Sequence, residues 1–171
     1  MLIVRVRKRA GMIASRKFAL ALSVAGVACV AGAGPCKAQS TAVIDGDTIE
    51  YRGVVVHLWG IDAPEKGQAC ADGWPAGRAA IDHLTDLMHG RTVSCTLKST
   101  ADSPRVSAVC TAGGQDLSAA MASAGMAWAL TSETREYTVQ ETNAMAGVWG
   151  VHGHPCLKAW EWRARQLKQS P

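Results

Sequence analysis

Short apolar runs rich in β-branched residues open the globular part of the chain and predict strands. Two runs rich in β-branched residues, Val43–Ile49 and Val54–Trp59, lie on either side of Tyr51-Arg52-Gly53. A glycine between two such runs is typical of a hairpin, because glycine accepts the positive φ that tight turns need. We therefore predict a β-hairpin near residue 52, with an acidic turn associated with each of its strands.

The apolar period changes to that of a helix further along the chain. Asp116 is typical of a helix N-cap, and Gly90 and Gly125 are typical of helix ends. Two further runs, Arg91–Leu97 and Arg105–Thr111, have the pattern of strands, and a short apolar run covers Met126–Leu130. This order of elements predicts an α+β fold, a small barrel with helices packed outside. The predicted helices are Pro75–Met88, Leu117–Ala124, Thr134–Ala146 and an amphipathic tail, Leu157–Lys168.

Residues 1–38 have the order of a signal peptide. Basic residues precede the apolar run Phe18–Val30, and small residues follow at Ala33 and Ala38, either of which suits a cleavage site. The apolar run is too short to favour a permanent membrane anchor. We expect an exported protein, periplasmic or secreted, whose residues 39–171 form one domain; the start at Met1 or at Met12 stays open.

The basic charge of the chain belongs to this leader. The chain has 18 Lys and Arg against 14 Asp and Glu, and seven of the basic residues lie within residues 1–38. Without the leader, 14 acidic side chains face 11 basic ones. A nucleic-acid site must therefore be a local patch and not a general basic field.

Four cysteines remain after the leader, an even number that is typical of disulfides in an exported protein. Cys95 and Cys110 lie on two neighbouring strand-like runs, which predicts that they pair. The two remaining cysteines, Cys70 and Cys156, are then predicted to pair with each other. A zinc site that uses these thiols is disfavoured, because the chain has no CxxC spacing.

The two acidic turns contain the candidate chemistry. A hairpin near residue 52 brings Asp45 and Asp47 toward Asp62 and Glu65, and clustered carboxylates repel one another unless a cation is present. Asp47 and Asp62 suit calcium or magnesium, with the carbonyl of Ala63 as a further oxygen. Glu65 can then act on a water as a general base. The alternative is that Asp45 and Asp47 only build an Asx-type turn.

Phosphodiester chemistry also needs a cation for the charge that develops on the phosphate oxygens. Arg105, at the start of a strand-like run, is the candidate, because arginine binds phosphate through two hydrogen bonds. The tail is basic as well, and for it a solvated helix face is favoured over phosphate contact. Its basic residues are Lys158, Arg163, Arg165 and Lys168.

These motifs together resemble the staphylococcal-nuclease-like (thermonuclease) family. The resemblance rests on Val43-Ile-Asp-Gly-Asp-Thr-Ile49, on His57-Leu-Trp-Gly-Ile-Asp-Ala-Pro-Glu65 with Gln68, on Arg105, and on Glu141…Ala144…Gly147-Val-Trp149. It implies an OB-fold, a five-stranded β-barrel with about three packed helices. It also implies calcium-dependent hydrolysis of phosphodiester bonds in DNA or RNA. We further expect a monomer that prefers single-stranded substrates.

The resemblance also assigns roles to individual residues. Asp47 and Asp62, with the carbonyl of Ala63, match the family's calcium ligands. Glu65 matches its proposed general base, and Arg105 matches one of its two catalytic arginines. For substrate binding, the family's tyrosines imply a role for Tyr137, and the exposed setting of Trp74 in a Gly-Trp-Pro loop suggests that it stacks on a base.

The chain departs from the family at His57, where the second catalytic arginine is expected. If an imidazolium there replaces the arginine, activity should peak toward pH 6. The turn before Arg105 is shortened to Asp102-Ser-Pro-Arg105, and the third helix is about three residues short. Two functions follow: a weakened calcium-dependent nuclease, or an impaired OB-fold module that binds single-stranded nucleic acid or a protein partner.

Overall fold

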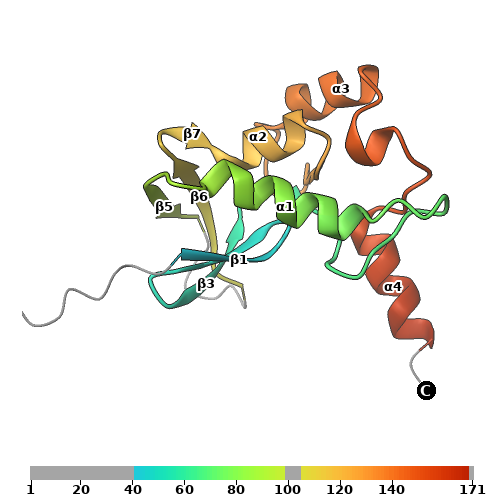
Figure 1. The fold of residues 1–171 in the computed structure, drawn as a ribbon, viewed down its shortest axis with the longest axis horizontal. Helices are drawn as coiled ribbons and strands as arrows, with labels where there is room; N and C mark the ends of the chain where they lie inside the picture. The colour runs from blue at the N-terminus through green and yellow to red at the C-terminus, as the bar shows by residue number, and fades with distance from the viewer. Residues whose placement is uncertain (1–40, 99–104, 170–171) are drawn as a thin grey trace, which may run out of the picture. The chain divides into compact units, whose positions relative to one another are not determined.

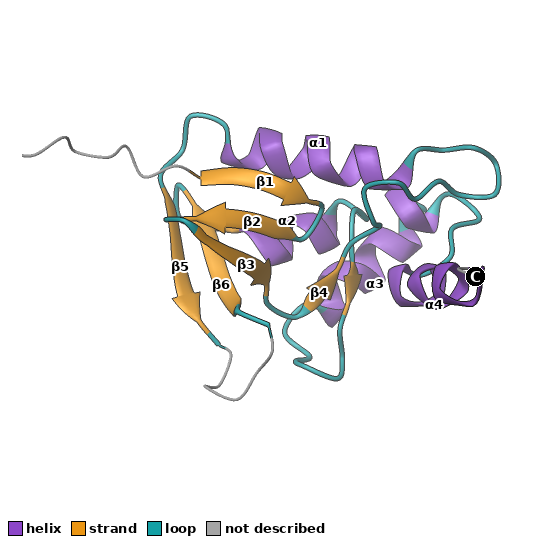
Figure 2. Ribbon diagram, turned by 90° about the horizontal axis from the view of Figure 1, so that it is seen from below, coloured by secondary structure: helices purple, strands orange, loops and turns teal. Residues whose placement is uncertain are grey.

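The computed structural model describes residues 41–98 and 105–169. The predicted signal peptide and the shortened turn that begins at Asp102 lie outside the described residues. Figure 1 shows the described chain as a sheet with helices on one of its sides, and Figure 2 shows the same elements from below. The mixed α+β architecture is the predicted one.

Five strands form the main sheet, in the order β1-β2-β3-β6-β5. β7 extends this sheet by pairing with β6, and β4 pairs with β8 in a separate two-stranded sheet. The strands β1 to β4 are Thr41–Asp45, Thr48–Tyr51, Val54–Leu58 and Ile61–Asp62, and β5 to β8 are Val93–Leu97, Ser107–Ala112, Gln115–Asp116 and Trp128–Ala129.

The predicted hairpin is confirmed. Arg52 and Gly53 connect β2 and β3, and both have positive φ, 54° and 80°. A two-residue turn with positive φ at both positions matches the right-handed twist of paired strands. The register places Thr48 opposite His57, so the acidic turn before β2 lies at the end of the sheet where β3 leads into β4.

A parallel pair of strands brings the second half of the chain to the same end of the sheet. His57 on β3 lies opposite Ser107 on β6, and the His57 amide donates to the Val106 carbonyl at 2.8 Å. Arg105 precedes this pair directly, so the start of β6 carries it toward His57.

Helices α1 and α2 cover one side of the sheet and bury its apolar residues (Figures 1 and 2). Ile49 of β2, Leu84 of α1 and Met121 of α2 meet in one core and are 0% exposed. The helices are α1 Ala76–Met88, α2 Leu117–Ser123, α3 Thr138–Ala146 and α4 Ala159–Gln169, with a short 3-10 turn, η1, at Gly150–His152.

The predicted start of the third helix at Thr134 is wrong. α3 begins at Thr138, because the preceding residues are used for turns. The Thr134 amide donates to the Leu130 carbonyl, and the Glu133 carboxylate accepts from the Gly60 amide at 2.9 Å. These contacts attach the segment to the end of the sheet in place of a first helical turn.

Two disulfides join Cys95 to Cys110 and Cys70 to Cys156. The first lies between directly opposed residues of β5 and β6. The second joins the loop before α1 to the segment before α4, two regions that are 86 residues apart. Among the helices that the structure describes, none combines the length and the apolar composition that a membrane span requires.

We expect Asp116→Ala to lower the free energy of unfolding by at least about 1 kcal/mol, because it removes the N-cap of α2 and the acceptor of the buried Tyr137 hydroxyl. The Asp116 side chain accepts from the Ala119 amide at 3.0 Å and caps α2, as predicted. Denaturant unfolding measures the effect. Asp86→Ala is the matched control, because Asp86 is an exposed aspartate within α1. Equal stability of the two variants would refute the capping role.

Candidate functional site

The two acidic turns meet at the end of the sheet. The Asp47 carboxylate accepts from the Ala63 amide at 3.2 Å, and the Asp47 carbonyl accepts from the Leu58 amide at 2.8 Å. Asp45 has a different role. Its carboxylate accepts from the Gly46 amide and, at 3.3 Å, from the Lys66 amide, so it ties the first turn to the loop that follows the second.

The position of Asp47 is unfavourable for a negative charge on its carboxyl group. Desolvation of its carboxyl group raises its pKa to about 6, and the neighbouring Asp62 and Asp45 carboxylates act in the same direction. Its two hydrogen bonds come from neutral donors, the Thr48 hydroxyl at 2.7 Å and the Ala63 amide. A carboxylate in this setting favours the approach of a cation.

His57 is connected to Asp47 through Thr48. The Thr48 hydroxyl donates to Asp47, and its oxygen lies 2.9 Å from His57 Nδ1. Nη2 of Arg105 lies 3.4 Å from the same ring nitrogen. Burial and the Arg105 charge lower the pKa of His57 below its ordinary 6.5, so the imidazole is neutral at pH 7.

Asp62 is paired with an arginine from the last helix. The Arg163 guanidinium donates to both oxygens of the Asp62 carboxylate, at 2.9 and 2.8 Å, and to Glu65 at 2.6 Å. The Asp62 side chain is only 6% exposed. The hydrogen bonds to Asp62 raise the pKa of Arg163, so its charge is permanent.

The loop that carries Glu65 is fixed by Gln68, which is 2% exposed. The Gln68 side-chain oxygen accepts from the Glu65 amide, and its nitrogen donates to the Leu157 carbonyl at 2.6 Å. The Gln68 carbonyl in turn accepts from the amide of Gly77 in α1. One buried amide side chain therefore links the Glu65 loop to the segment before α4.

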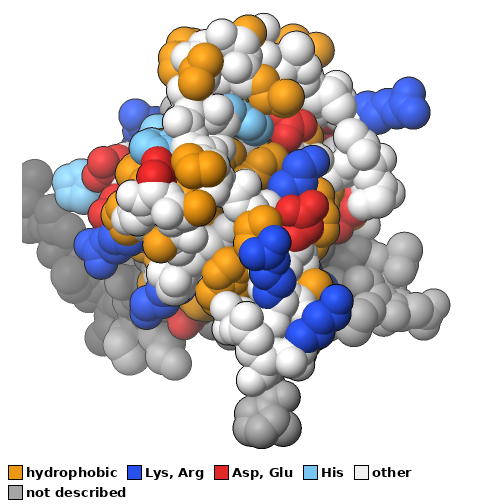
Figure 3. Space-filling model, turned by 90° about the vertical axis from the view of Figure 1, so that its right-hand side faces the viewer, with side chains coloured by type: hydrophobic (Ala, Val, Ile, Leu, Met, Phe, Trp, Pro, Cys, Tyr) orange, Lys and Arg blue, Asp and Glu red, His pale blue; other side chains and the backbone are white. Residues whose placement is uncertain are grey.

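Asp47, His57 and Asp62 line one pocket of about 400 Å³, and Glu65 and Gln68 lie outside its wall. Trp160 of α4 and residues 129–133 complete its wall. Figure 3 shows the face that carries α4, where basic and acidic side chains lie next to one another. The charged and titratable residues that the pocket brings together are Asp47, His57, Asp62, Arg105, Glu133 and Arg163.

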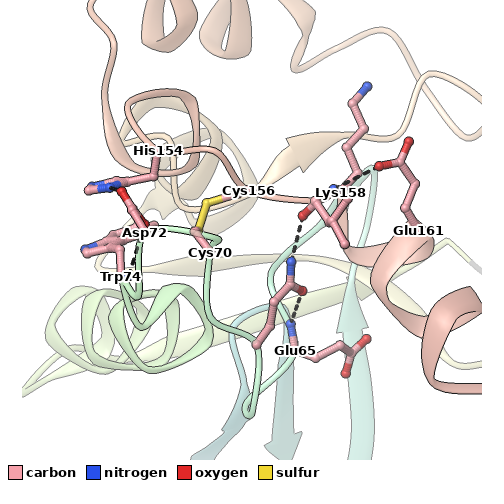
Figure 4. The surroundings of a disulfide bond; sticks show 10 residues. Glu65, Cys70, Asp72, Trp74, His154, Cys156, Lys158 and Glu161 are labelled. Atoms are coloured by element: carbon pink, nitrogen blue, oxygen red, sulfur yellow. Dashed lines mark hydrogen bonds and ion pairs between the residues drawn. A yellow bond between two sulfur atoms is a disulfide. The ribbon is translucent and has the colours of Figure 1, made fainter. Parts of the chain in front are cut away.

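Two residues that we expected to bind substrate lie elsewhere. Trp74 stacks on His154, with ring centroids 4.3 Å apart, beside an Asp72–His154 contact (Figure 4). Tyr137 is 3% exposed and donates to Asp116 at 3.2 Å, and burial raises its pKa to about 12. The structure places neither residue on the wall of the pocket.

The donors present fit a calcium ion in their chemistry. Asp47 and Asp62 supply hard oxygen atoms, and burial together with the neighbouring Asp62 and Asp45 carboxylates raises the pKa of Asp47, a setting that a bound cation would relieve. Among the described residues, no three His, Cys, Asp or Glu side chains form a ready metal cluster. Both Asp62 oxygens are instead bound by Arg163, so the fit requires that this guanidinium give way.

Comparison with known proteins decides the family. A sequence model described as staphylococcal nuclease homologue matches residues 55–147, which is more than half of the chain. The chain belongs to the staphylococcal nuclease family. The family consists of nuclease-type proteins that act on nucleic acids, and the α+β fold agrees with it. No curated protein matches the chain.

Arg163 and Glu133 are charged residues of the pocket to which the sequence assigned no role in the site, and Arg163 is the one that contacts the two carboxylates. It lies beyond the residues matched by the family, and its helix was interpreted as a solvated face. A signal was nevertheless present. The predicted Cys70–Cys156 pair fixes the start of the tail near the Glu65 loop, and Trp160 and Arg163 share a helix face at a spacing of three residues.

We expect Gly77→Ala to lower the free energy of unfolding by about 1–3 kcal/mol, the range for overpacking. A Cβ atom at Gly77 would overlap the backbone carbonyl of Glu65, which cannot move without shifting the loop. Thermal unfolding measures the effect. Gly67→Ala is the control, because a Cβ atom at Gly67 has no neighbour within 4 Å. A Gly77→Ala variant as stable as this control would contradict the close contact.

Proposed function

We propose that this member of the staphylococcal nuclease family is an exported, calcium-dependent nuclease that hydrolyses phosphodiester bonds in DNA or RNA. The observation that supports it is the meeting of Asp47, Asp62 and Arg105 in one pocket, with Glu65 held against Asp62 through a shared arginine. Carboxylates for a metal, a general base and a phosphate-binding cation are the parts that such hydrolysis needs.

Each residue has a separate task in this proposal. Asp47 and Asp62, with the Ala63 carbonyl, would hold calcium, which supplies positive charge for a phosphate oxygen and orients it. Glu65, 29% exposed in its side chain, takes the proton of the attacking water as general base. Arg105, exposed two residues before β6, donates to the phosphate oxygens on which negative charge develops.

The proposed compartment and oligomeric state rest on separate observations. Export is supported by the leader-like order of residues 1–38 and by the two disulfides, since disulfides persist in oxidising compartments. The proposed protein is a monomer and has no stable membrane anchor. The residues to which the proposal assigns a role all belong to one chain, so the proposed chemistry does not require a second copy.

We expect the purified protein to cut single-stranded DNA with millimolar calcium and to leave it intact in the presence of a chelator. Glu65→Gln should lower the rate at least about a hundredfold, because a general base contributes on the order of 10²–10⁴. Glu136→Gln, which neutralises an exposed glutamate before α3, is the matched control. Intact DNA in both conditions would refute the nuclease, and equal rates of the two variants would refute the role of Glu65.

The second candidate function, an OB-fold module that binds without cleaving, is favoured by the neutral state of His57. Burial and Arg105 keep the pKa of His57 low, so an imidazolium does not replace the missing arginine at pH 7. In that case the site retains binding groups and loses turnover. Salt-sensitive binding of single-stranded DNA without cleavage would select this function, and absence of binding at low salt would favour a protein partner.

We expect His57→Arg to raise the cleavage rate at pH 8 by about tenfold or more, because an arginine beside a phosphoryl group adds permanent charge. The lowered pKa of His57 also predicts that wild-type activity does not peak toward pH 6. Cleavage rates at pH 6 and pH 8 check both statements. His57→Gln, neutral at both pH values, is the control. Equal rates for the arginine and glutamine variants would contradict the expectation.

A further inference from the structure

The contact between Arg163 and the two carboxylates places a positive charge where the proposed calcium function needs a metal. Arg163 uses both oxygens of Asp62 and one oxygen of Glu65. A two-pronged pair of this kind is among the stronger charge contacts in proteins. A guanidinium that bonds both oxygens of a carboxylate occupies part of their lone pairs, and a second cation at the same carboxylate is repelled by the first.

The position of α4 is fixed independently of this contact. The Cys70–Cys156 disulfide joins the loop after Glu65 to the segment that leads into α4, as Figure 4 shows. The Ala71 amide donates to the Pro155 carbonyl at 3.2 Å, and Gln68 donates to the Leu157 carbonyl. The helix therefore begins beside the Glu65 loop whichever partner the guanidinium takes.

Apolar packing supports the same placement. Ala159, the first residue of α4, is 0% exposed and packs with Trp128 and Val151. Trp160 makes an edge contact with Trp128, with ring centroids 6.2 Å apart. The Arg163 side chain is 36% exposed, so it has room to leave the carboxylates while the helix stays in place.

We infer that Arg163 is a built-in competitor of calcium, which neutralises Asp62 and Glu65 in the metal-free protein and must release them before the ion binds. This inference rests on the proposed function and adds that Arg163 regulates calcium binding at the proposed metal site. The apparent calcium affinity is lowered by the fraction of molecules in which Arg163 is released. If that fraction is about one in ten, removal of the guanidinium tightens calcium binding about tenfold.

Calcium titration of the purified protein by isothermal calorimetry tests the inference without using activity. We expect Arg163→Gln to bind calcium about tenfold more tightly than wild type. Arg165→Gln is the matched control, because it removes the same charge from an exposed position of the same helix. We expect its affinity to stay within about twofold of wild type, since screened surface charges act weakly.

A thermal unfolding series gives a second readout. Without calcium, Arg163→Gln should have a lower Tm than wild type, because the nearly buried Asp62 carboxylate loses its partner. Added calcium should then raise the Tm of Arg163→Gln more than that of wild type. If Arg163→Gln does not fold without calcium, Arg163→Lys takes its place, since lysine keeps the charge but not the two-pronged contact.

The outcomes separate the inference from the proposed function. Equal calcium affinity in wild type, Arg163→Gln and Arg165→Gln would overturn the competition and leave a calcium-dependent nuclease intact. An equal gain in calcium affinity in both glutamine variants would also overturn the competition, because the net charge of the protein and not the Arg163 contact would then set the calcium affinity. If none of the proteins binds calcium, the calcium dependence fails together with the inference. If Arg163→Lys is used in place of Arg163→Gln, a calcium affinity equal to that of wild type overturns the competition.

Discussion

Burial of the Asp62 carboxylate next to that of Asp47 demands a compensating positive charge, and much of the candidate site is arranged around this demand. Arg163 meets it from a position 101 residues further along the chain. Asp47 receives only neutral donors, and its pKa rises to about 6. The two aspartates thus differ in environment, one compensated by a guanidinium and the other dependent on a proton or a metal ion.

The same constraint explains why the parts around the site are held so firmly. Two turns that carry like charges separate unless the backbone holds them together. The Asp47–Ala63 hydrogen bond and the Asp45–Lys66 hydrogen bond join the turns directly. Gln68 then fixes the second turn to the segment before α4. Rigid attachment lets carboxylates stay near one another at a cost that the hydrogen bonds offset.

The parts of this arrangement that the sequence predicted depend on local signals. The hairpin at Gly53, the cap at Asp116 and the helix before Gly90 each follow from neighbouring residues. The meeting of Asp47 with the second turn follows from the hairpin register. Arg163 was not predicted, because its position depends on a contact between distant segments that helical periodicity does not contain.

Two aromatic residues illustrate the same limit of local reasoning. The setting of Trp74 between glycine and proline indicates exposure, but its stacking on His154 depends on the fold of a segment 80 residues away. Tyr137 lies near the predicted start of the third helix. The later start of that helix, at Thr138, leaves Tyr137 in the core, where its hydroxyl donates a hydrogen bond to Asp116.

The Cys70–Cys156 bridge has a further consequence in terms of effective concentration. Arg163 follows Cys156 by seven residues, so the bridge keeps the guanidinium within reach of Asp62 at all times. A group tethered over a short distance acts as if it were present at about millimolar concentration or above. In the proposed calcium site, dissolved calcium would then compete with a tethered cation and not with water alone. A covalent bond outside the pocket would therefore help to set the calcium concentration at which the ion replaces Arg163 in the proposed site.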